Sequence, residues 1–209
     1  MDGVYPYILV VRDLASGKLL LSLPAEVEDA QTAGSALVSL FREHEAPLVI
    51  KADNNLAFTA QEPQELLSPW SPFFLLSPLG MPSYNGFCEA GIGSLKTRVH
   101  HLAARHGRPG GWSCDDVEAA RVQANQTARS RGHRFPTPDV AWNQREGIGS
   151  SEVRAFAWAG HRFGRRGRQE LGLADRVHSR APLGGDPPAG LVHADRGAGP
   201  GLFLNLLVR

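Results

Sequence analysis

Two short apolar, β-rich runs near the N-terminus constrain the fold of this chain most. The first run, from Tyr7 to Val11, reads Tyr-Ile-Leu-Val-Val, and the second extends from Lys18 to Leu23. Ala15-Ser16-Gly17 lies between them and has the composition of a tight turn, so the two runs predict a β-hairpin.

Helical and strand-like segments alternate after the hairpin. Residues 30–43 carry apolar side chains at the spacing of one helical face, and Leu48-Val49-Ile50 is a short apolar strand that leads to Asp53. We expect further helices over residues 59–67, 84–106, 113–129 and 140–144, and a strand over residues 73–76. Ser113 with Asp116 has the pattern of a capping box, with Asp in place of Glu. This alternation predicts an α/β domain.

The composition changes near residue 146. Twelve of the 23 glycines lie in residues 146–209, no lysine follows Lys96, and residues 182–188 are interrupted by proline and glycine. Such a stretch offers little apolar surface from which to build a packed core. We therefore expect one α/β domain over residues 1–145 and a weakly ordered tail over residues 146–209.

The overall composition leaves the function to local features. The 209 residues include 22 basic and 21 acidic side chains, so total charge does not point to a polyanionic partner. Cys88 and Cys114 are far apart and belong to no metal-binding or disulfide pattern. No apolar run is long enough to cross a bilayer, and the N-terminus lacks a signal peptide. We expect a cytoplasmic protein without a membrane partner.

Two carboxylates and one lysine form the strongest candidate site. Asp53 directly follows an apolar strand. Glu89 lies near the start of a predicted helix, and 35 residues separate it from Asp53. Gly93 and Lys96 follow Glu89 at the i+4 and i+7 positions, which share one helical face. A carboxylate pair can hold Mg²⁺, and Gly93 would let a nucleic-acid backbone approach while Lys96 contacts a phosphate. The same spacing also occurs on helix faces that are only solvated.

Three segments in order resemble the integrase catalytic core of the DDE-type transposases and retroviral integrases. Residues 48–58 read Leu-Val-Ile-Lys-Ala-Asp-Asn-Asn-Leu-Ala-Phe, similar to the family's segment around its second catalytic aspartate. Residues 82–89 read Pro-Ser-Tyr-Asn-Gly-Phe-Cys-Glu, similar to Pro-x-x-Asn-Gly-x-x-Glu, and residues 94–98 resemble the leucine-lysine segment that follows it. The 35-residue spacing is also the family's, and the resemblance covers about residues 1–145.

The resemblance implies both a fold and a chemistry. The fold is α/β: a ribonuclease H-like mixed sheet flanked by helices. Asp53 and Glu89 would be catalytic and would bind two Mg²⁺ ions, or Mn²⁺ in their place. Lys96, Arg98 and Asn85 would contact DNA, with Asn85 also shaping the turn before Glu89. The function would be DNA integration or transposition by cleavage and strand transfer, on transposon ends and target DNA, by a homo-oligomer.

The family's third carboxylate has no counterpart in this sequence. It lies on the first, central strand of the sheet, which precedes the hairpin, whereas only six residues precede Tyr7 here. Asp2 is the one acidic residue among them, and Asp13 is better explained as a turn former. We expect an N-terminally truncated core without its central strand, whose neighbours would have unpaired backbone groups. The alternative function is therefore an inactive transposase fragment with residual nucleic-acid binding.

Other chemistries have less support. Residues 91–97 resemble a phosphate loop, but they lack Gly directly before Lys96 and fall within a helical pattern. His100, His101 and His106 are close in sequence, but no paired cysteines accompany them as in a zinc site. A glycosidase that uses Asp53 and Glu89 would lack an aromatic platform for the sugar.

Overall fold

A computed structural model of the chain describes residues 5–52, 61–76, 86–129, 132–156, 158 and 203–207. The chain divides into two compact units. The first contains Met1–Gly147 together with Pro200–Arg209, and the second contains Ile148–Gly199. In the second unit, residues 150–156 are helical. The candidate site belongs to the first unit.

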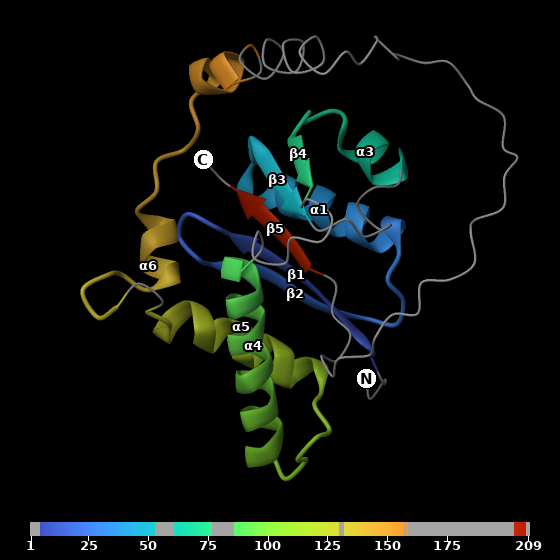
Figure 1. The fold of residues 1–209 in the computed structure, drawn as a ribbon, viewed down its shortest axis with the longest axis vertical. Helices are drawn as coiled ribbons and strands as arrows, with labels where there is room; N and C mark the ends of the chain where they lie inside the picture. The colour runs from blue at the N-terminus through green and yellow to red at the C-terminus, as the bar shows by residue number, and fades with distance from the viewer. Residues whose placement is uncertain are drawn as a thin grey trace, which may run out of the picture. The chain divides into compact units, whose positions relative to one another are not determined.

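A five-stranded sheet forms the centre of the first unit, in the order β2-β1-β5-β3-β4 (Figure 1). The strands are β1 (Tyr7–Asp13), β2 (Leu19–Ala25), β3 (Val49–Ala52), β4 (Phe73–Leu76) and β5 (Phe203–Leu207). β1 and β2 pair antiparallel, which confirms the predicted hairpin, and β3 and β4 pair in parallel. The predicted strand over residues 73–76 matches β4.

The central position of the sheet is occupied by β5, from the C-terminal end of the chain. β5 pairs in parallel with β1 and antiparallel with β3, so that Leu204 is in register with both Val11 and Ala52. The prediction of unpaired backbone groups beside a missing central strand was therefore wrong for β1 and β3. A strand within residues 146–209 was also not expected. Because β1 and β3 run in opposite directions, any strand between them is parallel to one and antiparallel to the other.

Each face of the sheet is covered by helices of its own. Leu9, Val11 and Ile50 pack on one face with α1 (Ala30–His44), α3 (Gln61–Leu67) and α6 (Pro138–Asn143). Val10 packs on the opposite face with α4 (Gly86–Arg105) and α5 (Cys114–Thr127). Alternate residues of a strand point to opposite faces, so a continuous apolar run such as β1 is suited to a sheet that is covered on both sides.

The turn between β1 and β2 uses Asp13 as its anchor, as the sequence predicted. The Asp13 Oδ2 atom accepts hydrogen bonds from the Ser16 backbone N–H, at 2.7 Å, and from the Ser16 hydroxyl. Gly17 donates its N–H to the Asp13 carbonyl at 2.8 Å and has a φ of 79°, a conformation that favours glycine. Asp13 is fully buried in this role.

The start of α1 provides a first testable prediction. Asp29 caps the helix, since its side chain accepts hydrogen bonds from the Thr32 N–H at 2.7 Å and from the Thr32 hydroxyl at 2.8 Å. These bonds lower the pKa of Asp29. We expect Asp29→Ala to reduce the free energy of unfolding by about 1 kcal/mol at pH 7 in urea denaturation. Asp29→Asn should retain most of the cap.

The lowered pKa of Asp29 sets the sign of its pH dependence. The ionised cap contributes stability above the carboxylate's unfolded pKa, and this contribution is lost as the pH falls through the folded pKa. The difference in stability between the wild type and Asp29→Asn should therefore shrink at acidic pH. An equal difference at pH 7 and pH 2.5 would contradict the assignment of Asp29 as an ionised cap.

Candidate nucleic-acid interface and carboxylate site

Glu89 lies in the first turn of α4 and is exposed. A carboxylate at this end of a helix is stabilised by the helix dipole. Asp53 directly follows β3 in the sequence, but it lies outside the described residues, as does Asn85. The proximity of Asp53 to Glu89 and the role of Asn85 therefore stay predictions. Asp2 also lies outside the described residues.

The predicted face of α4 is a continuous helical surface. Gly93 is exposed, and a Cβ atom added there would meet no atom of the described residues within 4 Å. Lys96, one turn further along, is half-buried. Residues 91–97 all lie within α4, which agrees with the rejection of a phosphate loop. Glu89, Gly93 and Lys96 thus present the arrangement that the sequence predicted for them.

A buried arginine lies on the sheet beneath α4. Arg12, on β1, is 7% exposed, and its Nε atom donates to the Gly17 carbonyl at 3.0 Å. A Cβ atom added at Gly91 would lie 2.2 Å from Arg12 Nη1, so the guanidinium would have to shift if this residue had a side chain. The sequence did not reveal this contact, because an arginine at the end of a hairpin strand is usually solvated.

Gly91 and Gly93 form a matched pair for a second prediction. Gly93→Ala should stabilise the chain by up to about 1 kcal/mol, since alanine favours the helix and the position is open. The free energy of unfolding of Gly91→Ala should be about 2 kcal/mol lower than that of Gly93→Ala, because Arg12 must move and lose its bond to Gly17. Thermal and urea unfolding of both variants would measure the gap, and equal stabilities would refute the packing of Arg12 against Gly91.

Basic residues, and no acid, surround the central strand where the described sheet faces α4. Asn205 on β5 is in register with Arg12 on β1 and Lys51 on β3. The side chains before and after Lys51 pack with α1, so alternation directs Lys51 to the α4 face of the sheet. β5 reads Phe-Leu-Asn-Leu-Leu and contains no carboxylate. The third acid of the family's site therefore has no counterpart on this strand.

The described residues by themselves do not make up the two-metal site that the resemblance implies. That site needs several carboxylates around two cations. The described residues offer Glu89, whereas Asp53 and Asp2 lie outside them. The two residues in register with Asn205 of the central strand, Arg12 and Lys51, are basic. Within the residues that the structure describes, no three His, Cys, Asp or Glu side chains gather as a metal-binding group. His100, His101 and His106 accordingly form no such group.

Arg98 lies on a different face of α4 from Lys96. Its side chain lines a groove of about 690 Å³, mostly along α4, to which α5 contributes Gln123. The Arg98 Nη1 atom donates to the Thr127 hydroxyl on α5 at 3.3 Å. Two helical residues that are two positions apart differ in direction by about 200°. Arg98 and Lys96 thus lie on different sides of α4, and the role of each as a DNA contact stays a prediction.

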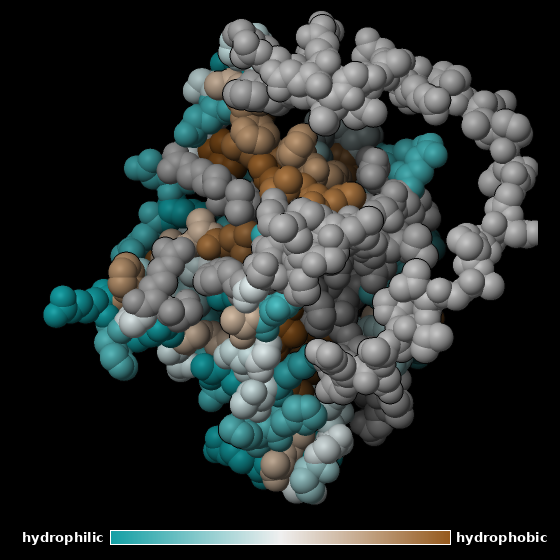
Figure 2. Space-filling model, in the orientation of Figure 1, coloured by the Kyte–Doolittle hydropathy of each residue, from teal (hydrophilic) through white to brown (hydrophobic). Residues whose placement is uncertain are grey.

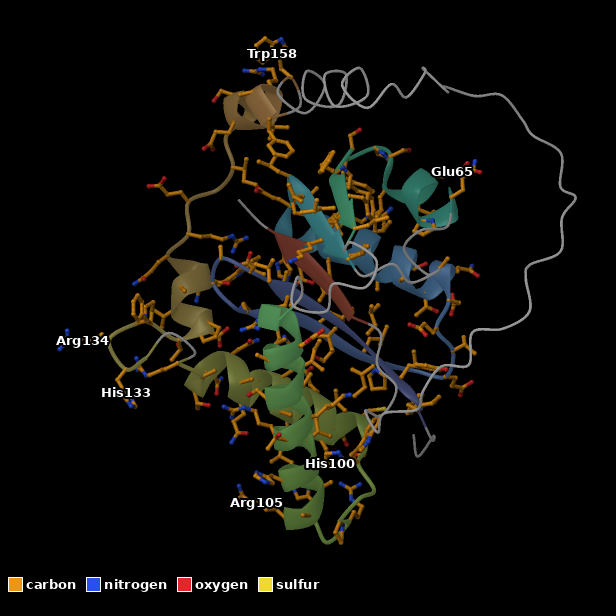
Figure 3. All side chains as sticks on the ribbon, in the orientation of Figure 1. Glu65, His100, Arg105, His133, Arg134 and Trp158 are labelled. Carbon is orange, nitrogen blue, oxygen red and sulfur yellow. The ribbon has the colours of Figure 1, made fainter. Side chains whose placement is uncertain are left out.

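The side chains of this region are shown in Figure 3, where Arg105 extends from α4 near its C-terminal end. Arg105 lines the same groove as Arg98 but was not singled out from the sequence. The sequence could have indicated Arg105 by its spacing of seven residues from Arg98, since the i and i+7 positions share a face.

The described helices include none with the length and apolar character of a membrane span.

The sheet and the helices on its two faces form an α/β fold, and comparison with solved structures supports the ribonuclease H-like class. The chain is similar to the catalytic core domain of BIV integrase, with a TM-score of 0.51 and 20% identity over 65% of this chain and 93% of that one. It is also similar to the HTLV-2 integrase catalytic core domain in complex with magnesium, in its dimeric form. That match has a TM-score of 0.50 and 18% identity over 68% and 99% of the two chains.

A third similar structure is a chain from the simian T-cell lymphotropic virus intasome in complex with PP2A regulatory subunit B56 gamma. The TM-score is 0.58 and the identity 18%, and the match covers 70% of this chain but only 58% of that one. Neither a family model nor a curated protein sequence matches the chain. The resemblance to retroviral integrase catalytic cores is thus a resemblance of fold.

Proposed function

We propose that this chain binds DNA through an integrase-type core and does not by itself complete metal-dependent strand transfer. The observation that carries the proposal is the central strand β5, which has Asn205 between Arg12 and Lys51 and no acid. A transition state held by two metals needs the negative charge of several carboxylates. Basic side chains at these positions oppose the binding of metal cations beside this strand.

DNA binding on this core would use the open face of α4. Gly93 itself has no side chain that would keep a phosphate backbone from the helix, and Lys96 lies one turn away. Asn85, directly before α4, would contribute to the same contact. Because total charge is nearly balanced, this local arrangement has to provide the attraction. Contacts of this kind position a duplex without reading its sequence.

The second candidate is DNA integration or transposition by a DDE-type core. It is favoured by Asp53, which directly follows the buried end of β3, and by Glu89 in the first turn of α4. Bound Mg²⁺ or Mn²⁺ would activate the attacking oxygen and stabilise the leaving oxygen of a phosphodiester. Asp53 and Glu89 would be the residues that hold it, and a homo-oligomer on transposon ends and target DNA would be the acting form.

A binding experiment tests the first proposal and gives a third prediction. Fluorescence anisotropy of a labelled duplex should show binding by the full chain that weakens with NaCl. Lys96→Gln should reduce the slope of log K against log[NaCl] by about 0.9, the loss of one phosphate contact. Glu89→Gln, on the same face, should bind at least as tightly as the wild type. Binding that is absent, or independent of salt, would refute the proposal.

A further inference from the structure

The groove along α4 that contains Arg98 is distinct from the face that carries Glu89 and Lys96. Its basic side chains are Arg98, His101 and Arg105, and Ser94 precedes them. Positions 94, 98, 101 and 105 repeat at four, three and four residues, which keeps them on one side of a helix. Glu89, Gly93 and Lys96 repeat on a side that is turned away by more than a quarter of a revolution.

The charge of the groove is of one sign. Among the described residues, two arginines and one histidine line it together with neutral side chains, and no carboxylate does. Neither Arg98 nor Arg105 forms an ion pair with any acid in the described ranges. The nearby acid Glu118 of α5 is occupied by Arg121, whose Nη2 lies 2.6 Å from Glu118 Oε1. The guanidinium groups therefore keep donors for an anionic ligand.

A network of hydrogen bonds positions one of these guanidinium groups. Thr127 donates its hydroxyl to the Gln123 carbonyl at 2.7 Å and accepts from Arg98 Nη1 at 3.3 Å. This bond holds Arg98 toward α5 and uses one of its five N–H groups. Thr97 and Ser94 add hydroxyls along the groove, and the Thr97 hydroxyl donates to the Gly93 carbonyl at 2.9 Å.

The spacing of the arginines indicates the kind of anion. Arg98 and Arg105 are seven residues apart on α4, a rise of about 10 Å along the helix. A single phosphate cannot bridge that distance, whereas a nucleic-acid strand advances about 3.4 Å per nucleotide and presents phosphates repeatedly. The surface of α4 around its C-terminal half is mostly hydrophilic (Figure 2), which suits a phosphate backbone better than an apolar partner.

We infer that this groove is a second binding surface for the DNA phosphate backbone, with Arg98 and Arg105 as its principal contacts and His101 between them. The inference rests on the proposed DNA-binding function and extends it to a face of α4 from which Glu89 is directed away. DNA held there would be positioned by the chain without lying at the predicted carboxylate site.

The test compares two variants of equal charge in the full chain. Arg98→Gln/Arg105→Gln removes both groove contacts, and the control Arg42→Gln/Arg134→Gln removes two exposed arginines elsewhere. Fluorescence anisotropy with a labelled duplex at about 0.1 M NaCl should show at least about a tenfold increase in Kd for the groove variant and a salt slope lower by about 1.8. The control should change both quantities much less. Arg98→Lys/Arg105→Lys, which keeps the charge, should retain most of the slope.

Three outcomes would overturn the inference. If the groove variant matches the control while Lys96→Gln still weakens binding, the groove is not a contact, although the proposed DNA-binding function survives. If the wild-type chain binds no duplex, the groove and the proposed function fail together. If poly-glutamate competes as well as unlabelled DNA at equal charge concentration, the groove does not select a phosphate backbone. Circular dichroism of each variant confirms that the comparison is made between folded chains.

Discussion

Asn205→Pro is expected to unfold the first unit or to reduce its stability by about 3 kcal/mol or more. Asn205 lies in the middle of β5, and its backbone pairs on both sides, with β1 and with β3. Proline has no N–H for the ladder and its ring does not fit within a central strand. With typical stabilities of about 5–15 kcal/mol, such a loss is a large share of the total.

The control for this variant is Asn205→Ala, which keeps the backbone N–H and should leave the pairing intact. Urea denaturation followed by circular dichroism gives the stability of each, and hydrogen exchange reports on β1 and β3 directly. The amides of Val11 and Ile50 should lose protection in Asn205→Pro but not in Asn205→Ala. Equal stability and unchanged protection in the two variants would show that β5 does not hold the centre of the sheet.

We expect Asp116→Ala to reduce the free energy of unfolding by about 3 kcal/mol, because it removes contacts at the junction of α4 and α5. Asp116 is 0% exposed, and its carboxylate accepts from His106 Nδ1 at 2.8 Å and from Arg108 Nη2 at 2.9 Å. It also accepts from the Ser113 N–H at 2.9 Å and completes the capping box of α5. Removing one member of such a buried, charged network leaves the other groups without their partner.

The neighbouring Asp115 is a matched control, since it is exposed in the same helical turn. Asp115→Ala should lose only the small interaction with the helix dipole, about 0.5 kcal/mol. Urea denaturation of both variants at pH 7 measures the difference. If Asp116→Ala were no less stable than Asp115→Ala, the buried network would contribute nothing measurable.

The Asp116 network also predicts sensitivity to acid. Burial by itself would raise the pKa of Asp116, but hydrogen bonds from Ser113 and His106 and the charge of Arg108 hold it below the usual value. Because the folded pKa is the lower one, this contribution is present above the unfolded pKa and is lost as the pH falls through the folded pKa. The advantage of the wild type over Asp116→Ala should accordingly shrink below about pH 4.

Features with local causes could be predicted from the sequence. The capping box at Ser113 and Asp116 and the hairpin anchored by Asp13 depend on residues within a few positions of one another, and both are present. The extents of α1 and β4 follow from periodicity and from apolar runs. The similarity to integrase cores was likewise predicted, from the segments around Asp53 and Glu89.

Features with non-local causes could not be predicted in this way. β5 pairs the end of the chain with strands near its beginning, and no local pattern around Asn205 records that partner. The position of Arg12 against Gly91 depends on how α4 packs on the sheet. The bond from Arg98 to Thr127 likewise depends on how α4 packs against α5. The pairing of Asp53 with Glu89 stays a prediction.

The most direct test of the central claim is a strand-transfer assay on the full chain. A DNA oligonucleotide with a free 3′-hydroxyl and a plasmid target are incubated with the protein and Mg²⁺ or Mn²⁺, and covalent products are measured beside DNA binding. Because its central strand lacks an acid, the wild-type chain should bind the DNA but yield no more covalent product than the Asp53→Asn variant. Metal-dependent product that is lost in both Asp53→Asn and Glu89→Gln would contradict this account and establish the chain as an active DDE-type enzyme.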